Sequence, residues 1–108
     1  MIYEQRVYHT MPGRMPDLLN RFEQVTLPIW ERFGIRQAGF WTVVVGGSSA
    51  DLIYLLAWDS MAEREQKWAA FLADPEWVRE KARTEENGAL ISSYSNAFWA
   101  PTAFSAVR

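Results

Sequence analysis

The segment from Leu55 to Trp77 constrains the fold more than any other part of the chain. An apolar run ends at Trp58, and Ser60 and Glu63 stand three residues apart just before an amphipathic stretch, the pattern of a helix-opening capping box. Asp74 to Trp77, with the sequence Asp-Pro-Glu-Trp, then interrupts that stretch. Proline belongs in the first turn of a helix because it lacks a backbone N–H. The segment therefore predicts a strand followed by two consecutive helices.

The first of these helices is expected over Met61–Ala73. In a capping box the Ser60 hydroxyl accepts from the N–H of Glu63, and the Glu63 carboxylate accepts from the N–H of Ser60. Such a cap contributes about 1 kcal/mol, so its role is structural, and the neighbouring Asp59 needs no catalytic role. The apolar face of the helix is expected to contain Met61, Trp68, Phe71 and Leu72.

Turn residues and hydrophobic periodicity divide the rest of the chain into similar elements. A helical stripe runs from Met15 to Phe33. Because Pro28 removes one backbone hydrogen bond, we expect a kink or break between Gln24 and Pro28. A short charged helix is expected over Pro75–Thr84. Four strands are expected, over Ile2–Thr10, Gln37–Val45, Leu52–Trp58 and Leu90–Trp99.

The element order is β-α-β-β-α-β, in a single domain of residues 1–108. The turn Gly-Gly-Ser-Ser at 46–49 makes the second and third strands a hairpin. Such an order predicts an α+β fold with the helices on one face of a four-stranded antiparallel sheet. The other face would be bare in a chain that is 15% aromatic. We therefore expect two sheets to pack together in a homodimer or a larger oligomer, with the apolar tail Phe98–Phe104 crossing a neighbouring subunit.

Charge and composition exclude several classes of function. Eleven basic and thirteen acidic residues are interspersed, so nucleic-acid binding is not expected. The absence of cysteine removes disulfides, thiolate nucleophiles and cysteine-ligated zinc, and a single histidine makes another metal site unexpected. No apolar run approaches membrane-spanning length, and the first ten residues do not resemble a signal peptide. We expect a cytoplasmic protein without membrane partners or a cofactor.

Several short motifs stand in a fixed order along the chain. They are Tyr3-Glu4-x-Arg6-x-Tyr8, Pro12-Gly13, Gly39-Phe40-Trp41 with Gly46, Trp58-Asp59-Ser60 with Arg64, and Asp74-Pro75-Glu76-Trp77. With these motifs the sequence resembles, from Tyr3 to about Trp77, the NIPSNAP family of the dimeric α+β barrel superfamily. The resemblance implies a ferredoxin-like subunit whose sheet pairs with that of a second subunit to form a barrel.

The resemblance implies little about biochemistry, because the family is named for neighbouring genes rather than for an activity. The chain departs from the family pattern at Gln5, where an apolar residue is usual. It departs again at Leu56 and Trp58, where a Trp-x-Tyr pair is common.

The first strand carries the strongest candidates for a site. Glu4, Arg6 and Tyr8 share one face of this strand because side chains alternate. Together they could line a pocket in which Arg6 pairs with an anionic or carbonyl group. The alternative is that Glu4 and Arg6 form a structural ion pair with each other or across strands. Arg64 is the next candidate, and we expect it to pair with a neighbouring carboxylate.

Aromatic residues suggest where a ligand would lie. Trp41, Trp58, Trp68 and Trp77 fit either core and subunit-interface positions or a hydrophobic cleft between sheet and helices. Tyr54 and Tyr94 would supply polar contacts in that cleft. The predicted ligand-binding residues are Glu4, Arg6, Tyr8, Trp41, Tyr54, Trp58 and Arg64.

Catalytic candidates are fewer. Arg6 and Tyr8 are two of them, and His9, the only histidine, is the third. His9 could act as a general base or a haem ligand. However, it has no evident orienting carboxylate or second ligand in the sequence, which is more typical of an exposed residue.

Three hypotheses for function follow. The first is a protein that binds a small hydrophobic or aromatic ligand in the sheet–helix cleft, without established catalysis. The second is a cofactor-free monooxygenase or isomerase acting on an aromatic or polyketide-like substrate, in which Arg6 would hold an oxyanion and Tyr8 or His9 would move a proton. The third is an assembly module that binds no ligand.

Overall fold

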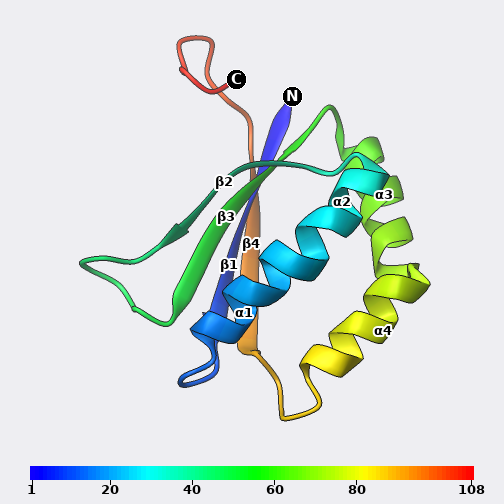
Figure 1. The fold of residues 1–108 in the computed structure, drawn as a ribbon. Helices are drawn as coiled ribbons and strands as arrows, with labels where there is room; N and C mark the ends of the chain where they lie inside the picture. Colours follow the sequence, from blue (N-terminus) through cyan, green and yellow to red (C-terminus); the bar gives the residue numbers. More distant parts are fainter.

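The computed structural model describes residues 1–108 as a two-layer α+β fold. The sheet has the order β2-β3-β1-β4 and every pair in it is antiparallel. Figure 1 shows that all the helices cover the same side of this sheet. The elements are β1 (Ile2–Thr10), α1 (Met15–Arg21), the π-helical turn η1 (Phe22–Thr26), α2 (Leu27–Phe33), β2 (Arg36–Thr42), β3 (Asp51–Trp58), α3 (Met61–Ala73), α4 (Pro75–Thr84) and β4 (Ile91–Trp99). The predicted ferredoxin-like fold is confirmed.

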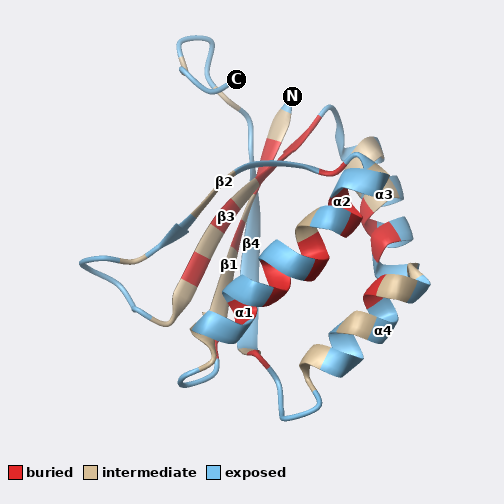
Figure 2. Cartoon of the chain, in the orientation of Figure 1, coloured by how far each residue is buried: buried red, intermediate tan, exposed pale blue.

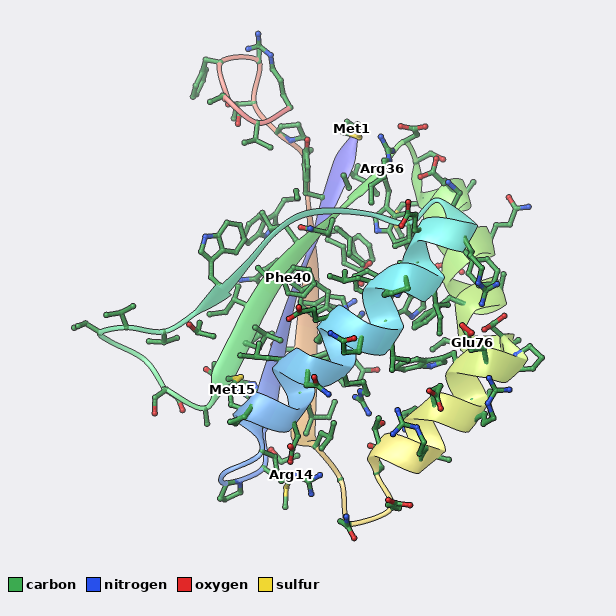
Figure 3. All side chains as sticks on the ribbon, in the orientation of Figure 1. Met1, Arg14, Met15, Arg36, Phe40 and Glu76 are labelled. Carbon is green, nitrogen blue, oxygen red and sulfur yellow. The ribbon has the colours of Figure 1, made fainter.

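An aromatic core lies between the sheet and the helices. Trp30 of α2 is almost fully buried and is surrounded by the rings of Phe22, Phe40, Tyr54, Trp68 and Phe71. Figure 2 shows the buried parts of the helices on the sides that face the sheet. Side chains from both layers meet in this space, with Phe40 of β2 among them (Figure 3). Phe40 stacks on Tyr54 with ring centroids 4.7 Å apart.

The first helix changes its hydrogen bonding at the predicted kink. Residues Phe22–Thr26 form a π-helical turn between α1 and α2, and the N–H of Leu27 donates to the carbonyl of Phe22, five residues earlier. Pro28 follows directly and has no N–H to donate, so the regular ladder cannot continue through it. Val25 and Thr26 are buried in this altered turn. The expected irregularity between Gln24 and Pro28 is confirmed.

The second strand is shorter than predicted. It ends at Thr42, which pairs with Leu52, whereas the sequence predicted a strand as far as Val45. Val44 and Val45 are more than 90% exposed. Their β-branched side chains favour a strand, but β3 begins at Asp51 and offers no residues for them to pair with.

The predicted capping box is half correct. The Ser60 hydroxyl accepts from the N–H of Glu63 at 3.1 Å, as expected. The Glu63 carboxylate, however, accepts from the N–H of Asp59 rather than that of Ser60, at 3.4 Å. On α3, Trp68 and Phe71 are buried, but Met61 and Leu72 are exposed. The aromatic half of the predicted apolar face therefore makes the core contacts.

Asp74 lies between α3 and α4 and belongs to both. It ends α3, and its carboxylate accepts from the N–H of Trp77 at 3.0 Å, which caps α4. Arg32 of α2 also donates to it, at 3.0 Å.

The second face of the sheet has no helices on it. Trp41 and Trp99 are about half exposed, and a groove of about 390 Å³ lies between this face and the C-terminal tail. The tail extends past the end of the sheet, where Phe104 is exposed (Figure 1). No helix is both long and apolar enough to cross a bilayer. Pairing of two sheets in a dimer stays a prediction.

Candidate functional site

The carboxylate of Glu4 is the centre of a buried polar cluster. Glu4 is fully buried on the helix-facing side of β1. Together its two oxygens accept hydrogen bonds from side chains on three strands and one helix. The donors are Trp58 Nε1 at 3.1 Å, Arg64 Nε and Nη2 at 3.2 and 3.1 Å, Arg6 Nη1 at 2.9 Å, and Asn96 Nδ2 at 2.9 Å.

These donors keep Glu4 ionised. Burial alone would raise its pKa, but hydrogen bonds from Arg64, Asn96 and Arg6 outweigh burial and lower the pKa below its ordinary value. With its lone pairs occupied, the carboxylate is poorly suited to abstract a proton or bind a metal ion. No three histidine, aspartate or glutamate side chains in the molecule converge on a possible metal position. Glu4 therefore positions its neighbours, Arg6 and Arg64.

Arg6 is held in place by this cluster. Its Nε donates to the hydroxyl of Tyr54 at 2.8 Å, and its guanidinium carbon lies 4.6 Å from the centre of the Trp68 ring and 5.0 Å from that of Tyr94. Burial disfavours its charged form, but the interactions with Tyr54, Tyr8 and Glu4 outweigh burial and raise its pKa. Arg6 is therefore a fixed cation at neutral pH.

Tyr54 is neutral at the same pH. Burial, followed by the neighbouring Tyr8, raises the pKa of Tyr54 well above its ordinary value despite the nearby guanidinium of Arg6. Among carboxylates, only that of Glu4 contacts Arg6.

A cavity of about 180 Å³ opens beside Arg6, between the sheet and the helices. β1 and β4 form its floor, α3 and α4 cover it, and α1 closes one end. Five aromatic side chains supply much of its wall, namely Tyr8, Trp68, Phe71, Trp77 and Tyr94. Three cationic side chains, Arg6, Arg21 and Lys81, also line it. The arrangement can hold a flat ring on one side and present positive charge to it.

Arg21 enters this cavity from the last turn of α1. Its side chain is buried, and its guanidinium carbon lies 5.4 Å from the centre of the Trp77 ring. Nη1 donates to the Thr84 hydroxyl over a long 3.4 Å, and Glu85 is 3.8 Å away. Burial is the largest effect on Arg21 and lowers its pKa. The negative charge of Glu85 raises the pKa and only partly offsets the effect of burial. This cation is therefore incompletely paired.

The structure brings most of the predicted site residues together. Glu4, Arg6, Tyr54, Trp58 and Arg64 are joined by hydrogen bonds. Tyr8 lies 5.6 Å from the Arg6 guanidinium, measured to the ring centre. The expectation that Glu4 and Arg6 form an ion pair with each other also holds, at 2.9 Å. Arg6 and Tyr8 also line the cavity, whereas Glu4, Tyr54, Trp58 and Arg64 do not, so a ligand-binding role for this cluster stays a prediction.

Two predicted site residues lie elsewhere. Trp41 pairs with Ile53, on the sheet face without helices, and its ring packs so closely on Gly39 that a Cβ there would come within 2.5 Å of it. His9 lies on that same face, and its Nδ1 is 2.7 Å from Oδ1 of Asp51. The expectation that His9 has no orienting carboxylate was wrong. Neither side chain lines the cavity.

Asn96 and Arg21 are among the residues of the site that the sequence reasoning missed. Asn96 contacts Glu4 only through the pairing of β4 with β1, which no local pattern reveals. Arg21 had a detectable signal, because it lies three residues after Leu18 and four before Val25, on the buried stripe of the helix. A charged residue at such a position is expected to be buried and functional or paired.

Comparison with known proteins now identifies the family. The NIPSNAP family model matches residues 3–106. The chain belongs to the NIPSNAP family. The match extends beyond the predicted limit at Trp77 and includes β4, whose Asn96 and Tyr94 contribute to the site.

Solved NIPSNAP structures share the fold closely. An uncharacterised NIPSNAP domain protein from Burkholderia xenovorans is 25% identical, with a TM-score of 0.83, and the match covers 97% of this chain and 98% of that one. A NIPSNAP family protein of unknown function from Agrobacterium tumefaciens is 24% identical, with a TM-score of 0.87, covering 100% and 94%. Among curated proteins, none matches this NIPSNAP sequence.

More distant structures share only the fold. One from Nitrosomonas europaea is described as a candidate antibiotic biosynthesis monooxygenase. It is 6% identical to the NIPSNAP chain, with a TM-score of 0.63, and the match covers 94% of this chain and 98% of that one. Similarity at this level confirms the ferredoxin-like subunit and carries no residue roles.

Proposed function

We propose that this NIPSNAP protein binds a small planar aromatic ligand in the cavity between the sheet and helices α3 and α4. The observation that carries the proposal is the cavity itself, about 180 Å³ in volume and walled by five aromatic side chains. An apolar cavity of about 150 Å³ is large enough to hold benzene, so a single substituted ring fits this one. Ligand sites usually combine such walls with a few well-placed polar groups.

The site is already organised before a ligand arrives. Arg6 is fixed by Glu4 at 2.9 Å and by Tyr54 at 2.8 Å, and Trp68 packs against Phe71 with ring centroids 5.2 Å apart. Side chains held in this way lose little conformational entropy when a ligand binds. A cavity that served only as a packing defect would not require a buried cation at its wall, since that cation is costly to desolvate.

The test is a titration with two single-ring probes, benzoate and benzamide, followed by the indole N–H signals of Trp68 and Trp77 in ¹⁵N NMR spectra. We expect saturable shifts of both signals with at least one probe. Ile91→Phe, which places a ring in the cavity, should abolish them, whereas Val78→Phe on the exposed side of α4 should not. Absence of shifts with both probes, or equal shifts in Ile91→Phe, contradicts the proposal.

A second candidate is a cofactor-free monooxygenase or isomerase. It is favoured by the presence of Arg6 and Tyr8 at one wall of the cavity, and by the fold shared with the Nitrosomonas protein. Arg6 would stabilise an oxyanion and Tyr8 would move the proton. His9 cannot take this part, because it lies on the opposite face of the sheet. Oxygen consumption with hydroquinone as the probe, lost in Tyr8→Phe, would support this function over binding alone.

We also propose that the protein is a homodimer joined through the sheet face that carries no helices. Its support is the apolar surface that β1, β2, β3 and β4 present there, including Val7, Trp41, Ile53 and Trp99. Exposed aromatic residues gathered in this way are typical of subunit interfaces. The dimer is compatible with the ligand proposal, because the cavity lies on the other face. If the protein dimerises and binds neither probe, the assembly-module hypothesis is favoured.

A further inference from the structure

We infer that the ligand of this cavity is a single-ring aromatic carboxylate whose carboxylate group lies between Arg6 and Arg21. The inference rests on the proposed function and specifies its ligand class. It depends on three observations: the balance of charge around the cavity, the hydrogen-bond donors left free at its wall, and the cavity's size.

Positive charge exceeds negative charge at this site. Glu4 is shared between Arg6 and Arg64, at 2.9 and 3.1 Å. Glu85 pairs closely with Lys81 at 2.8 Å and only distantly with Arg21 at 3.8 Å. Glu65 also contacts Arg64, from the solvent side at 3.6 Å, so three carboxylates serve four cationic side chains. Since a buried cation without a full counter-charge is costly, an anion entering the cavity would be stabilised.

Unused donors belong to the two arginines at the wall. Arg6 donates through Nε and Nη1, and its Nη2 makes no hydrogen bond. Arg21 donates only through Nη1, which leaves Nε and Nη2 free. Only one fully buried side-chain nitrogen or oxygen lacks a hydrogen-bond partner, and it is Nε1 of Trp30. The unbonded nitrogens of Arg6 and Arg21 are therefore not fully buried. Both side chains line the cavity.

The remaining wall determines the rest of the ligand. Trp77 lies beside Arg21 and Tyr94 beside Arg6, so each cation is next to an aromatic ring. A ring attached to the bound carboxylate would pack against these side chains. The volume of about 180 Å³ accommodates one ring and a planar carboxylate. Guanidinium groups bind carboxylates in a planar, bidentate geometry.

The experiment compares benzoate with benzamide, which has the same ring and nearly the same shape but no charge. Calorimetric titration of the wild-type protein at pH 7 and low salt should give at least a 10-fold tighter Kd for benzoate. Arg21→Gln should remove most of this preference, and Arg21→Lys should keep part of it. Arg79→Gln is the matched control, because Arg79 is exposed on α4, does not line the cavity, and changes the net charge equally.

Each outcome decides between the two proposals. Equal binding of benzoate and benzamide overturns the carboxylate inference and leaves aromatic ligand binding intact. An equal loss in Arg79→Gln and Arg21→Gln also overturns it, because general charge would then explain the preference. Failure of both probes to bind overturns the inference together with the proposed function. Circular dichroism establishes whether Arg21→Gln is folded, and the wild-type Kd ratio tests the inference even if it is not.

Discussion

Arg64 donates two hydrogen bonds to the carboxylate of Glu4, from Nε at 3.2 Å and from Nη2 at 3.1 Å. This bidentate contact joins α3 to the centre of the sheet across 60 residues of sequence. Because Glu4 also accepts from Arg6, the same carboxylate fixes a cation at the wall of the cavity. Stability and the proposed binding function therefore depend on a common group.

Glu4→Gln is expected to destabilise the protein strongly. It leaves the buried Arg6 without its carboxylate and removes a partner from the partly buried Arg64, and removing one partner of a buried ion pair typically costs about 3–5 kcal/mol. Urea unfolding followed by tryptophan fluorescence measures the change. Glu65→Gln is the control, because Glu65 contacts Arg64 from the solvent side and exposed pairs contribute about 1 kcal/mol or less. Equal losses in the two variants would show that burial of Glu4 has no special effect.

The lowered pKa of Glu4 also predicts how stability depends on pH. The hydrogen bonds that Glu4 receives keep it ionised in the folded protein at pH values where the unfolded chain binds a proton. Its stabilising contribution is complete above its ordinary pKa of 4.5, and is lost as the pH falls towards the lower folded pKa. Unfolding free energies measured from pH 6 to pH 3 should fall more steeply for the wild type than for Glu4→Gln. Parallel curves would contradict this assignment.

The α3 cap predicts a smaller effect. Ser60→Ala removes the acceptor for the N–H of Glu63 and should lower the free energy of unfolding by about 1 kcal/mol. Ser49→Ala, in the exposed turn before β3, should change it by less than about 0.5 kcal/mol. Thermal unfolding of both variants provides the comparison, and indistinguishable midpoints would argue against the cap.

If the protein dimerises as proposed, a charged substitution in the interface should convert the dimer to monomers. Trp41→Arg places a cation on the apolar sheet face and should weaken dimerisation at least 10-fold. Val78→Arg adds the same charge on the exposed side of α4 and should leave the dimer intact. Sedimentation equilibrium at micromolar concentration distinguishes the two states. A monomeric wild-type protein under these conditions would refute the dimer proposal.

Local sequence patterns predicted what local interactions determine. The ends of α3 and α4 follow from Ser60, Asp74 and Pro75, whose capping and backbone preferences act within a few residues. The preference of valine for strands gave a wrong prediction at Val44 and Val45. A strand also needs a partner strand, and β3 provides none at these positions.

The site was predictable only in part for a similar reason. Alternation placed Glu4, Arg6 and Tyr8 on one face of β1, but not on a particular side of the sheet. The side of the sheet that they face depends on which residues of β3 and β4 pair with β1. The hydrogen bond from Asn96 to Glu4 depends on the same pairing. The position of Arg21 beside Trp77 likewise depends on how α1 and α4 pack together, which no short motif specifies.

The most direct test of a ligand site in this cavity is a crystal structure of the protein with 4-bromobenzoate, in which the anomalous signal of bromine locates the ring. We predict one strong peak inside the cavity walled by Tyr8, Trp77 and Tyr94, with the carboxylate within hydrogen-bond distance of Arg6 and Arg21. A cavity left empty while bromine is found only on the surface, or side chains that fill the space, would contradict the account.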